Sequence, residues 1–224
     1  QILKTYTVTG LGGAYNSNRL RHLLLRKFLK LVYIIIEKSY NTRIFFQNQS
    51  DELELFNRRE NKHKVLPGSG FDLYSGIVRP IAHKAKLNEL SIVLIAKCLP
   101  EKRVELFYNV AREFRTIYPK TKFVHYGALD PSSGRDLNYM LELAKSSGVN
   151  YKGRTKNLEK ELQNYDIVIS TSMREGLPRS ILESLANDLY VVGVDAPGVR
   201  DVIISPHCGQ IVDYSINSVI QGIL

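Results

Sequence analysis

The sequence predicts an α/β protein built on parallel sheets. Short apolar segments rich in Val, Ile and Leu alternate with amphipathic helical stretches along most of its 224 residues. Six of these segments lie beyond residue 89, and three lie before residue 67. Because consecutive strands joined by helices pair in parallel, we expect a Rossmann-like, doubly wound six-stranded sheet, preceded by a second, smaller parallel sheet.

The first 73 residues contain the three earlier strands. We expect strands at residues 4–9, 43–47 and 64–66 and helices at residues 18–37 and 51–58. Gly10-Leu-Gly-Gly13 follows the first strand, but Tyr15 occupies the place of the third glycine in a dinucleotide-binding loop, so that motif is rejected. Residues 74–89, which carry Pro80 and lysines, are interpreted as a link between two units.

The six strands of the second unit span residues 90–224. They are predicted at residues 90–96, 122–126, 149–152, 166–169, 190–194 and 210–212, each but the last followed by a helical stretch. The helix after the first strand has apolar residues at spacings of three and four, namely Val104, Phe107, Ala111 and Phe114. This stripe predicts a helix face packed into the core. His125 is predicted at a strand end, pointing toward the rim of the sheet, and a satisfied rim or core histidine is favoured there over a catalytic one.

Composition bounds the class of protein. The hydrophobic content of 44% and charged content of 24% are typical of a soluble globular chain. The longest apolar run, residues 31–36, is far short of the ~20 residues that span a bilayer. Cys98 and Cys208 stand apart, with no histidine at metal-ligand spacing, which argues against zinc or a disulfide framework and favours the cytoplasm. Because the chain begins with Gln1, we expect a fragment of a longer protein.

The formal net charge of +9 suits an anionic partner. The densest basic run, residues 19–30, alternates Arg and Lys with Leu and Phe at helical spacing and predicts a basic amphipathic helix. A solvated helix face is one interpretation. Contact with an anionic membrane surface or a polyprenol phosphate, at the inner face of the cytoplasmic membrane, is the other. A basic nucleic-acid-binding module is suggested by the charge alone, and no aromatic pattern supports it.

One stretch, residues 170–184, joins the fourth strand of the second unit to a helix. Pro178 suits the first turn of that helix, so Glu175 lies in the turn and Glu183 on the helix. A helix that starts at the carboxyl end of a parallel strand directs its free N–H groups into the ligand crevice of an open sheet, where phosphate is favoured. Without a ligand role, Glu175 is an exposed turn residue and Glu183 pairs weakly with Arg179.

The same stretch, Glu-x7-Glu with Glu-Gly-Leu-Pro at its start and Leu-Glu-Ser-Leu-Ala at its end, resembles the signature of the family 4 glycosyltransferases of GT-B fold. The resemblance implies that residues 1–73 are the last part of an acceptor-side domain, with 67–72 as the family's Pro-Gly-Ser-Gly-Val-Asp segment. Residues 74–89 then form the linker and residues 90–224 form the domain that binds the nucleotide-sugar donor.

The resemblance also implies a chemistry. It predicts a retaining, metal-independent transfer of a sugar from a nucleotide diphosphate sugar to a glycan or polyprenol-linked acceptor, in polysaccharide biosynthesis and without a cofactor. The sequence has no Asp-x-Asp pair to hold a metal, so positive charge would come from the protein. As most of the acceptor-side domain is absent, we expect this chain to bind nucleotide and to transfer sugar poorly or not at all.

Site residues follow by the same resemblance. Residues 96–102 resemble the family's Arg-Leu-x-x-x-Lys-Gly loop, which implies that Lys97 and Lys102 hold the diphosphate. Lysine at 97 replaces the usual arginine, and Arg103 replaces the usual glycine, so Arg103 either adds a cation or crowds the loop.

Seven more residues complete the implied donor site. The first glutamate of the motif, Glu175, is assigned to the transferred sugar, and the second, Glu183, to the ribose. The backbone of the turn would face the sugar or phosphate, and the end of the third strand would lie near the base. These flanking residues are Gly176, Leu177, Pro178, Gly153 and Arg154.

Two other functions stay open. A GT-B sugar epimerase would share the fold and the diphosphate site, but it needs acid and base groups that the sequence does not place. The nucleic-acid-binding module differs in class, and it predicts steeply salt-dependent binding that does not depend on Glu175.

Overall fold

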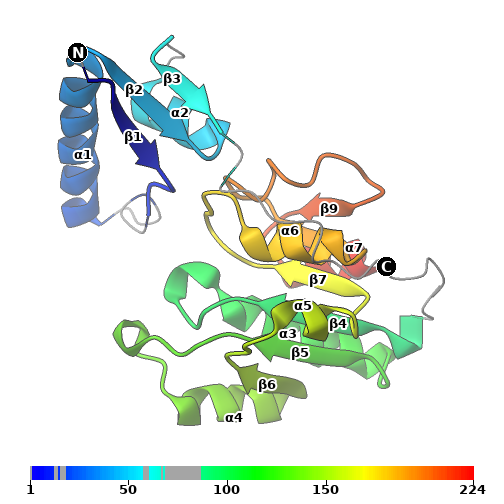
Figure 1. The fold of residues 1–224 in the computed structure, drawn as a ribbon. Helices are drawn as coiled ribbons and strands as arrows, with labels where there is room; N and C mark the ends of the chain where they lie inside the picture. The colour runs from blue at the N-terminus through cyan, green and yellow to red at the C-terminus, as the bar shows by residue number, and fades with distance from the viewer. Residues whose placement is uncertain (1, 13–14, 16–18, 58–60, 67, 69–86) are drawn as a thin grey trace.

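The computed structural model describes residues 2–12, 15, 19–57, 61–66, 68 and 87–224, which form two parallel sheets (Figure 1). The first sheet has strand order β1-β2-β3, and the second has strand order β6-β5-β4-β7-β8-β9. The predicted α/β class is confirmed, and so is the doubly wound order of the larger sheet. The predicted linker up to residue 86 and most of the 67–72 segment lie outside the described residues.

The smaller unit alternates strands and helices as predicted. Its elements are β1 (Lys4–Val8), α1 (Leu20–Lys38), β2 (Thr42–Phe46), α2 (Gln49–Phe56) and β3 (His63–Val65). All its strand pairs are parallel. Helix α2 begins two residues earlier than expected because Asn48 caps it: the Asn48 side chain accepts a hydrogen bond of 2.8 Å from the N–H of Asp51.

The larger unit begins at a short 3-10 turn, η3 (Leu87–Glu89). Its strands are β4 (Ser91–Ile95), β5 (Lys122–Tyr126), β6 (Val149–Gly153), β7 (Ile167–Ser170), β8 (Tyr190–Val194) and β9 (Gly209–Val212). Its helices are α3 (Val104–Ile117), α4 (Leu137–Ser147), α5 (Leu158–Leu162), α6 (Arg179–Ala186) and α7 (Ile216–Ile223), with 3-10 turns η4 (Pro100–Lys102) and η5 (Pro131–Ser133).

One expectation about the helices was wrong. We expected a helix after the fifth strand of this unit and none after the sixth, but β8 leads into turns and β9 leads into α7. Pro197 and Gly198, whose φ is 81°, interrupt the chain after β8. After β9, Ser215 caps α7 by accepting a hydrogen bond of 3.0 Å from the N–H of Ser218.

Helices cover both faces of the larger sheet. One core cluster packs α3, α4 and α7 against alternate residues of the strands, and a second packs α5 and α6 against the other residues. The stripe predicted on α3 is fully buried: Val104, Phe107, Ala111 and Phe114 each have 0% exposure. Both cysteines are free, with Cys98 buried and Cys208 half-buried.

His125 belongs to this core and not to the rim of the sheet. It is 0% exposed in the middle of the packing between β5 and α3. Its Nε2 lies 2.9 Å from the carbonyl oxygen of Ala96, which can only accept, so Nε2 carries the proton. Nδ1 then accepts from the Tyr108 hydroxyl at 2.8 Å. The neutral ring is fully satisfied, and burial lowers the pKa of His125 to about 4.

Removing the Phe114 ring should test the larger core. Because Phe114 is fully buried, Phe114→Ala should lower the free energy of unfolding by about 3–5 kcal/mol. Ile117 lies on the same helix but is 68% exposed, so Ile117→Ala should change it by less than about 0.5 kcal/mol. Urea unfolding followed by far-UV circular dichroism measures both. Equal losses in the two variants would contradict this description of α3.

His125 should also make stability depend on pH. Its folded pKa of about 4 lies below the ordinary 6.5, so the unfolded chain takes up this proton first as the pH falls. Between pH 7 and 4.5 this residue should remove about 2–3 kcal/mol of stability. Urea unfolding of His125→Gln at both pH values should show a smaller loss than the wild type. An equal loss in His125→Gln and in the wild type would contradict this role of His125.

Candidate functional site

The predicted site residues lie at the carboxyl end of the larger sheet. Its strand order reverses between β4 and β7, and in such sheets the crevice beyond this point binds ligands. The predicted site residues lie on or beside the segments that follow β4, β6 and β7: Lys97 and Lys102 follow β4, Gly153 ends β6 and Arg154 follows it, residues 175–178 follow β7, and Glu183 lies on α6. Figure 1 shows these loops on the side that faces the smaller unit.

Lys102 and Glu175 are brought into contact from loops 73 residues apart. Lys102 Nζ lies 2.5 Å from Glu175 Oε1, and the two side chains are 21% and 19% exposed. Their loops are joined by two further hydrogen bonds, from Thr171 Oγ1 to the Lys102 carbonyl at 2.6 Å and from the Met173 N–H to the Glu101 carbonyl at 2.9 Å. A cation and a carboxylate are therefore fixed together beyond the carboxyl ends of β4 and β7.

Arg103 neither reaches this pair nor crowds the loop. Its backbone is left-handed, with φ of 46°, a conformation that glycine adopts easily. The guanidinium lies over the Tyr214 ring, 4.0 Å from its centre, in cation–π geometry. The Arg103 side chain, at the position where the family has glycine, therefore packs against the loop before α7.

A second group of predicted residues surrounds a cavity of about 430 Å³. Lys97 and Arg154, at the ends of β4 and β6, both line it, together with Tyr126 and Leu158. Gly153, with φ of 66°, turns the chain at the edge of the cavity. Hydrogen bonds from Ser132 hold the pKa of Asp130 below its usual range, with help from Lys97. The cavity combines cations with apolar walls, which suits a flat base and a phosphate.

Glu183 forms an ion pair within its own helix. It lies on the second turn of α6, where Oε1 accepts from Arg179 Nε at 2.6 Å. Arg179 is 72% exposed and Glu183 is 15% exposed, so the arginine covers the carboxylate from the solvent side. The weak pair expected in the absence of a ligand is therefore present. Pro178 stands at the N-cap of α6, one residue before its first turn.

The turn between Glu175 and Pro178 has no spare room. A side chain at Gly176 would overlap the carbonyl oxygen of Thr9 and Oε1 of Gln47, both in the smaller unit. Leu177 packs close to Gly68 from the same unit. The turn that is predicted to bind the donor therefore packs tightly against the smaller unit.

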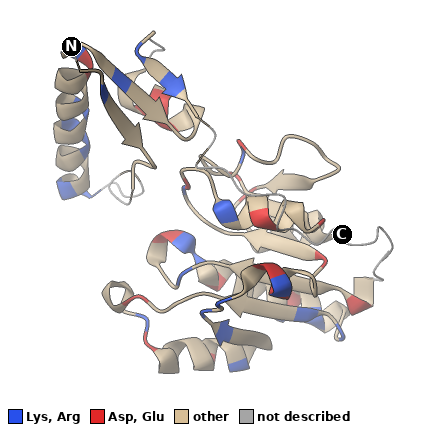
Figure 2. Cartoon of the chain, in the orientation of Figure 1, with Lys and Arg blue, Asp and Glu red and all other residues tan. Residues whose placement is uncertain are grey.

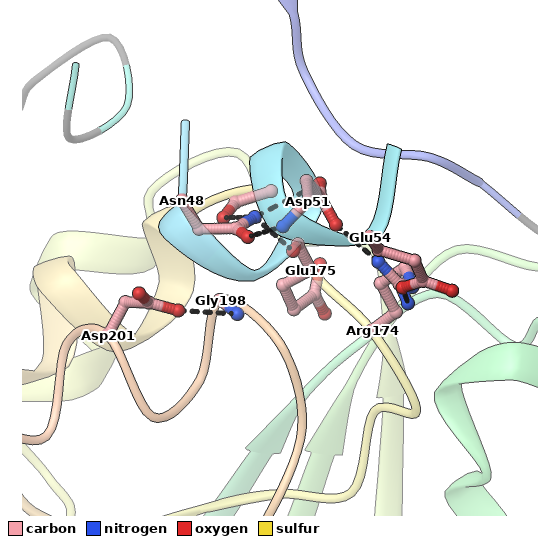
Figure 3. A network of polar contacts seen from close by, with 8 residues as sticks. Asn48, Asp51, Glu54, Arg174, Glu175, Gly198 and Asp201 are labelled. Carbon is pink, nitrogen blue, oxygen red and sulfur yellow. Dashed lines mark hydrogen bonds and ion pairs between the residues drawn. The ribbon is translucent and has the colours of Figure 1, made fainter. Parts of the chain in front are cut away.

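The sequence did not predict the polar contacts that hold this turn against the smaller unit. Arg174 forms ion pairs with Asp51 and Glu54 of α2, and Asn48 donates to the carbonyl of Gly176 at 2.8 Å (Figure 3). Asn48-Gln-Ser-Asp51 reads as a helix start, and that signal accounts for the cap alone. No local pattern could reveal partners more than 120 residues apart.

Two findings on the described part of the chain complete the description. Its His, Cys, Asp and Glu side chains form no group of three or more that could hold a metal ion. No helix among these residues is long and apolar enough to cross a membrane.

Comparison with known proteins identifies a matching family and one related protein. The family described as "Glycosyl transferases group 1" matches residues 80–223. Over 217 residues the chain is 29% identical to an N,N'-diacetylbacillosaminyl-diphospho-undecaprenol alpha-1,3-N-acetylgalactosaminyltransferase of Campylobacter jejuni, with 90% of this chain and 55% of that protein covered. The chain thus spans about half the length of this curated relative.

Solved structures agree on the fold. TarM superposes with a TM-score of 0.73 at 19% identity, covering 99% of this chain and 42% of TarM. HepE of Anabaena, solved with UDP and glucose, has a TM-score of 0.76 at 14% identity, covering 98% of this chain and 60% of HepE. Both are larger proteins, and the likeness at these identities concerns the fold. Since the family match covers most of the chain, from the start of the larger unit to α7, the chain belongs to the group 1 glycosyltransferases.

Proposed function

We propose that this chain forms the donor side of a glycosyltransferase that moves a sugar from a nucleotide diphosphate sugar to a lipid-linked glycan. The observation that carries the proposal is the contact of Lys102 with Glu175 at the carboxyl ends of β4 and β7. Such a pair offers a cation to phosphate and a carboxylate to sugar hydroxyls within one small space.

The diphosphate needs positive charge when the nucleotide departs. In the proposed complex Lys102 binds it from one side, and Lys97 and Arg154 bind it and the base from the cavity of about 430 Å³. The Lys102 side chain is 21% exposed, so a phosphate can reach it from the solvent. The phosphate then replaces the carboxylate as its partner.

Carboxylates suit the hydroxyl groups of the donor. Glu175 would accept hydrogen bonds from the transferred sugar, and Glu183 would accept them from the ribose once Arg179 swings away. We propose a retaining, metal-independent hexosyl transfer of the family 4 type. The absence of an Asp-x-Asp pair from the sequence supports it, because the cations near the crevice then come from the protein.

The epimerase alternative is disfavoured by His125. An epimerase needs acid and base groups beside the sugar, but His125 is buried and held in its neutral form by Tyr108 and Ala96.

The relative from Campylobacter jejuni carries an undecaprenol-linked acceptor in its name. A lipid-linked acceptor is accordingly part of the proposal, as is a place at the inner face of the cytoplasmic membrane.

Helix α1 supports that placement. It carries Arg and Lys along its length (Figure 2). A basic helix of this kind suits the headgroup region of an anionic bilayer.

Calorimetric titration without metal tests the donor site. UDP, GDP and UDP-N-acetylgalactosamine are titrated in EDTA, and one nucleotide should bind. Lys102→Ala should then weaken binding roughly 10- to 100-fold, because a charge-assisted hydrogen bond is worth about 1.5–3 kcal/mol. Glu183→Ala should weaken it roughly tenfold through the ribose.

Two matched substitutions serve as controls. Lys122→Ala changes an exposed lysine at the amino end of β5, and Glu113→Ala changes an exposed glutamate on α3. Both should stay within about twofold of the wild type, as they lie away from the crevice. If Lys122→Ala lowers affinity as much as Lys102→Ala does, binding follows net charge and the proposed site is wrong.

Flotation with lipid vesicles tests the role of α1. The chain should bind vesicles that contain phosphatidylglycerol, and the double variant Arg21→Ala/Lys27→Ala should bind roughly 30-fold less, as each cation near such a surface contributes about 1 kcal/mol. The variant Lys145→Ala/Lys160→Ala removes the same charge from the larger unit and should bind like the wild type. Equal losses in both variants would argue against α1 as the contact.

A further inference from the structure

The turn that carries Glu175 is enclosed by loops from both units. On the side of the smaller unit, a side chain at Gly176 would meet Thr9 and Gln47. On the side of the larger unit, a side chain at Gly198 would overlap the carbonyl oxygens of Glu175 and Gly176. The backbone of residues 175–176 therefore has a close neighbour on each side.

Asn48 uses one amide group to join a helix start to this turn. Its Oδ1 accepts from the Asp51 N–H at 2.8 Å, which caps α2. Its Nδ2 donates to the Gly176 carbonyl at 2.8 Å and to the Glu175 carbonyl at 3.2 Å, and it also lies 3.1 Å from Asp51 Oδ2. Asn48 is only 1% exposed, so water does not compete for these carbonyls.

Arg174 fastens the turn to the same helix from the other direction. Its guanidinium is paired with Asp51, which is fully buried, and with Glu54 (Figure 3). Burial raises the pKa of Asp51, and Arg174 opposes that rise. The residues on both sides of Glu175 are thus anchored to α2. Glu175 itself donates its N–H to the Pro197 carbonyl at 2.9 Å, which leaves the side chain pointing to Lys102.

We propose that Asn48 is a positioning residue for Glu175, so that the smaller unit sets the place where the donor sugar is held. The inference rests on the proposed function in one respect, that Glu175 contacts the sugar. Asn48 touches neither the cavity of about 430 Å³ nor Lys102, so its loss should affect the sugar part of the donor and spare the nucleotide part.

The test compares two asparagine caps. Asn48→Asp keeps the acceptor oxygen that caps α2 and removes the two N–H donors that hold the turn. Asn157→Asp makes the same change at α5, where Asn157 caps Lys160 from an exposed position. If Asn48→Asp fails to fold, Arg174→Met detaches the same turn with Asn48 intact. Its control is Arg200→Met, which breaks an exposed pair with Asp195.

Two measurements separate positioning from general destabilisation. Amide hydrogen exchange of the peptide around residues 174–177, without any ligand, should become roughly tenfold faster in Asn48→Asp and stay unchanged in Asn157→Asp. Calorimetry gives the second readout, the ratio of the Kd for UDP to the Kd for UDP-N-acetylgalactosamine. This ratio should fall at least fivefold in Asn48→Asp, to the level of Glu175→Gln, with the Kd for UDP kept within about twofold.

The outcomes are distinct. Unchanged exchange at residues 174–177 would overturn the proposal whatever the affinities. Faster exchange with an unchanged ratio would also overturn it, because the turn would then be held without effect on the sugar. If the wild type binds no nucleotide while exchange still rises in Asn48→Asp, the proposed function fails and the holding of the turn by Asn48 is supported.

Discussion

The turn between β7 and α6 has no room for a side chain at position 176, and the relation of the two sheets depends on that restriction. Glycine at 176 lets the carbonyl of Thr9 and the side chain of Gln47 approach the backbone of the larger unit. This close approach shields the carbonyls of Glu175 and Gly176 from solvent, so each needs a hydrogen-bond donor from the protein. Asn48 supplies both. Close approach and hydrogen bonding thus require each other, and Glu175 is held where the two units meet.

Sequence patterns predicted the sheets well because they depend on local periodicity. Alternating strands and helices predicted parallel pairing, and the α3 stripe predicted which face is buried. Pro178 marked the start of α6 to within one residue. The start of α2 was missed because the Asn48 cap was not weighed. His125 was placed near the rim because its strand was read by length alone; alternation along β5 puts it on the same face as Phe123, against α3.

The site was predictable only in part, for a physical reason. The order of strands places Lys97, Lys102, Glu175 and Glu183 at the carboxyl end of the larger sheet, in segments that follow β4 and β7. Their role in donor binding stays a prediction. What each side chain touches depends on the packing of distant loops. The contact of Arg103 with Tyr214 and that of Arg174 with Asp51 join residues more than 100 positions apart. No periodicity or spacing encodes such a pair, and the charge of +9 gives no hint of which cations are committed to partners.

How deeply the ion pair of each cation is buried decides whether that cation is available to a ligand. Lys102 meets Glu175 in a pair that is about one-fifth exposed, so we expect it to exchange this partner for a phosphate. Arg174 meets Asp51, which is fully buried, and breaking a buried pair by removing one partner costs about 3–5 kcal/mol. A diphosphate that approached both would therefore recruit Lys102 and leave Arg174 in place. Of the adjacent residues 174 and 175, the first fixes the turn to the smaller unit, and the second is the one proposed to meet the ligand.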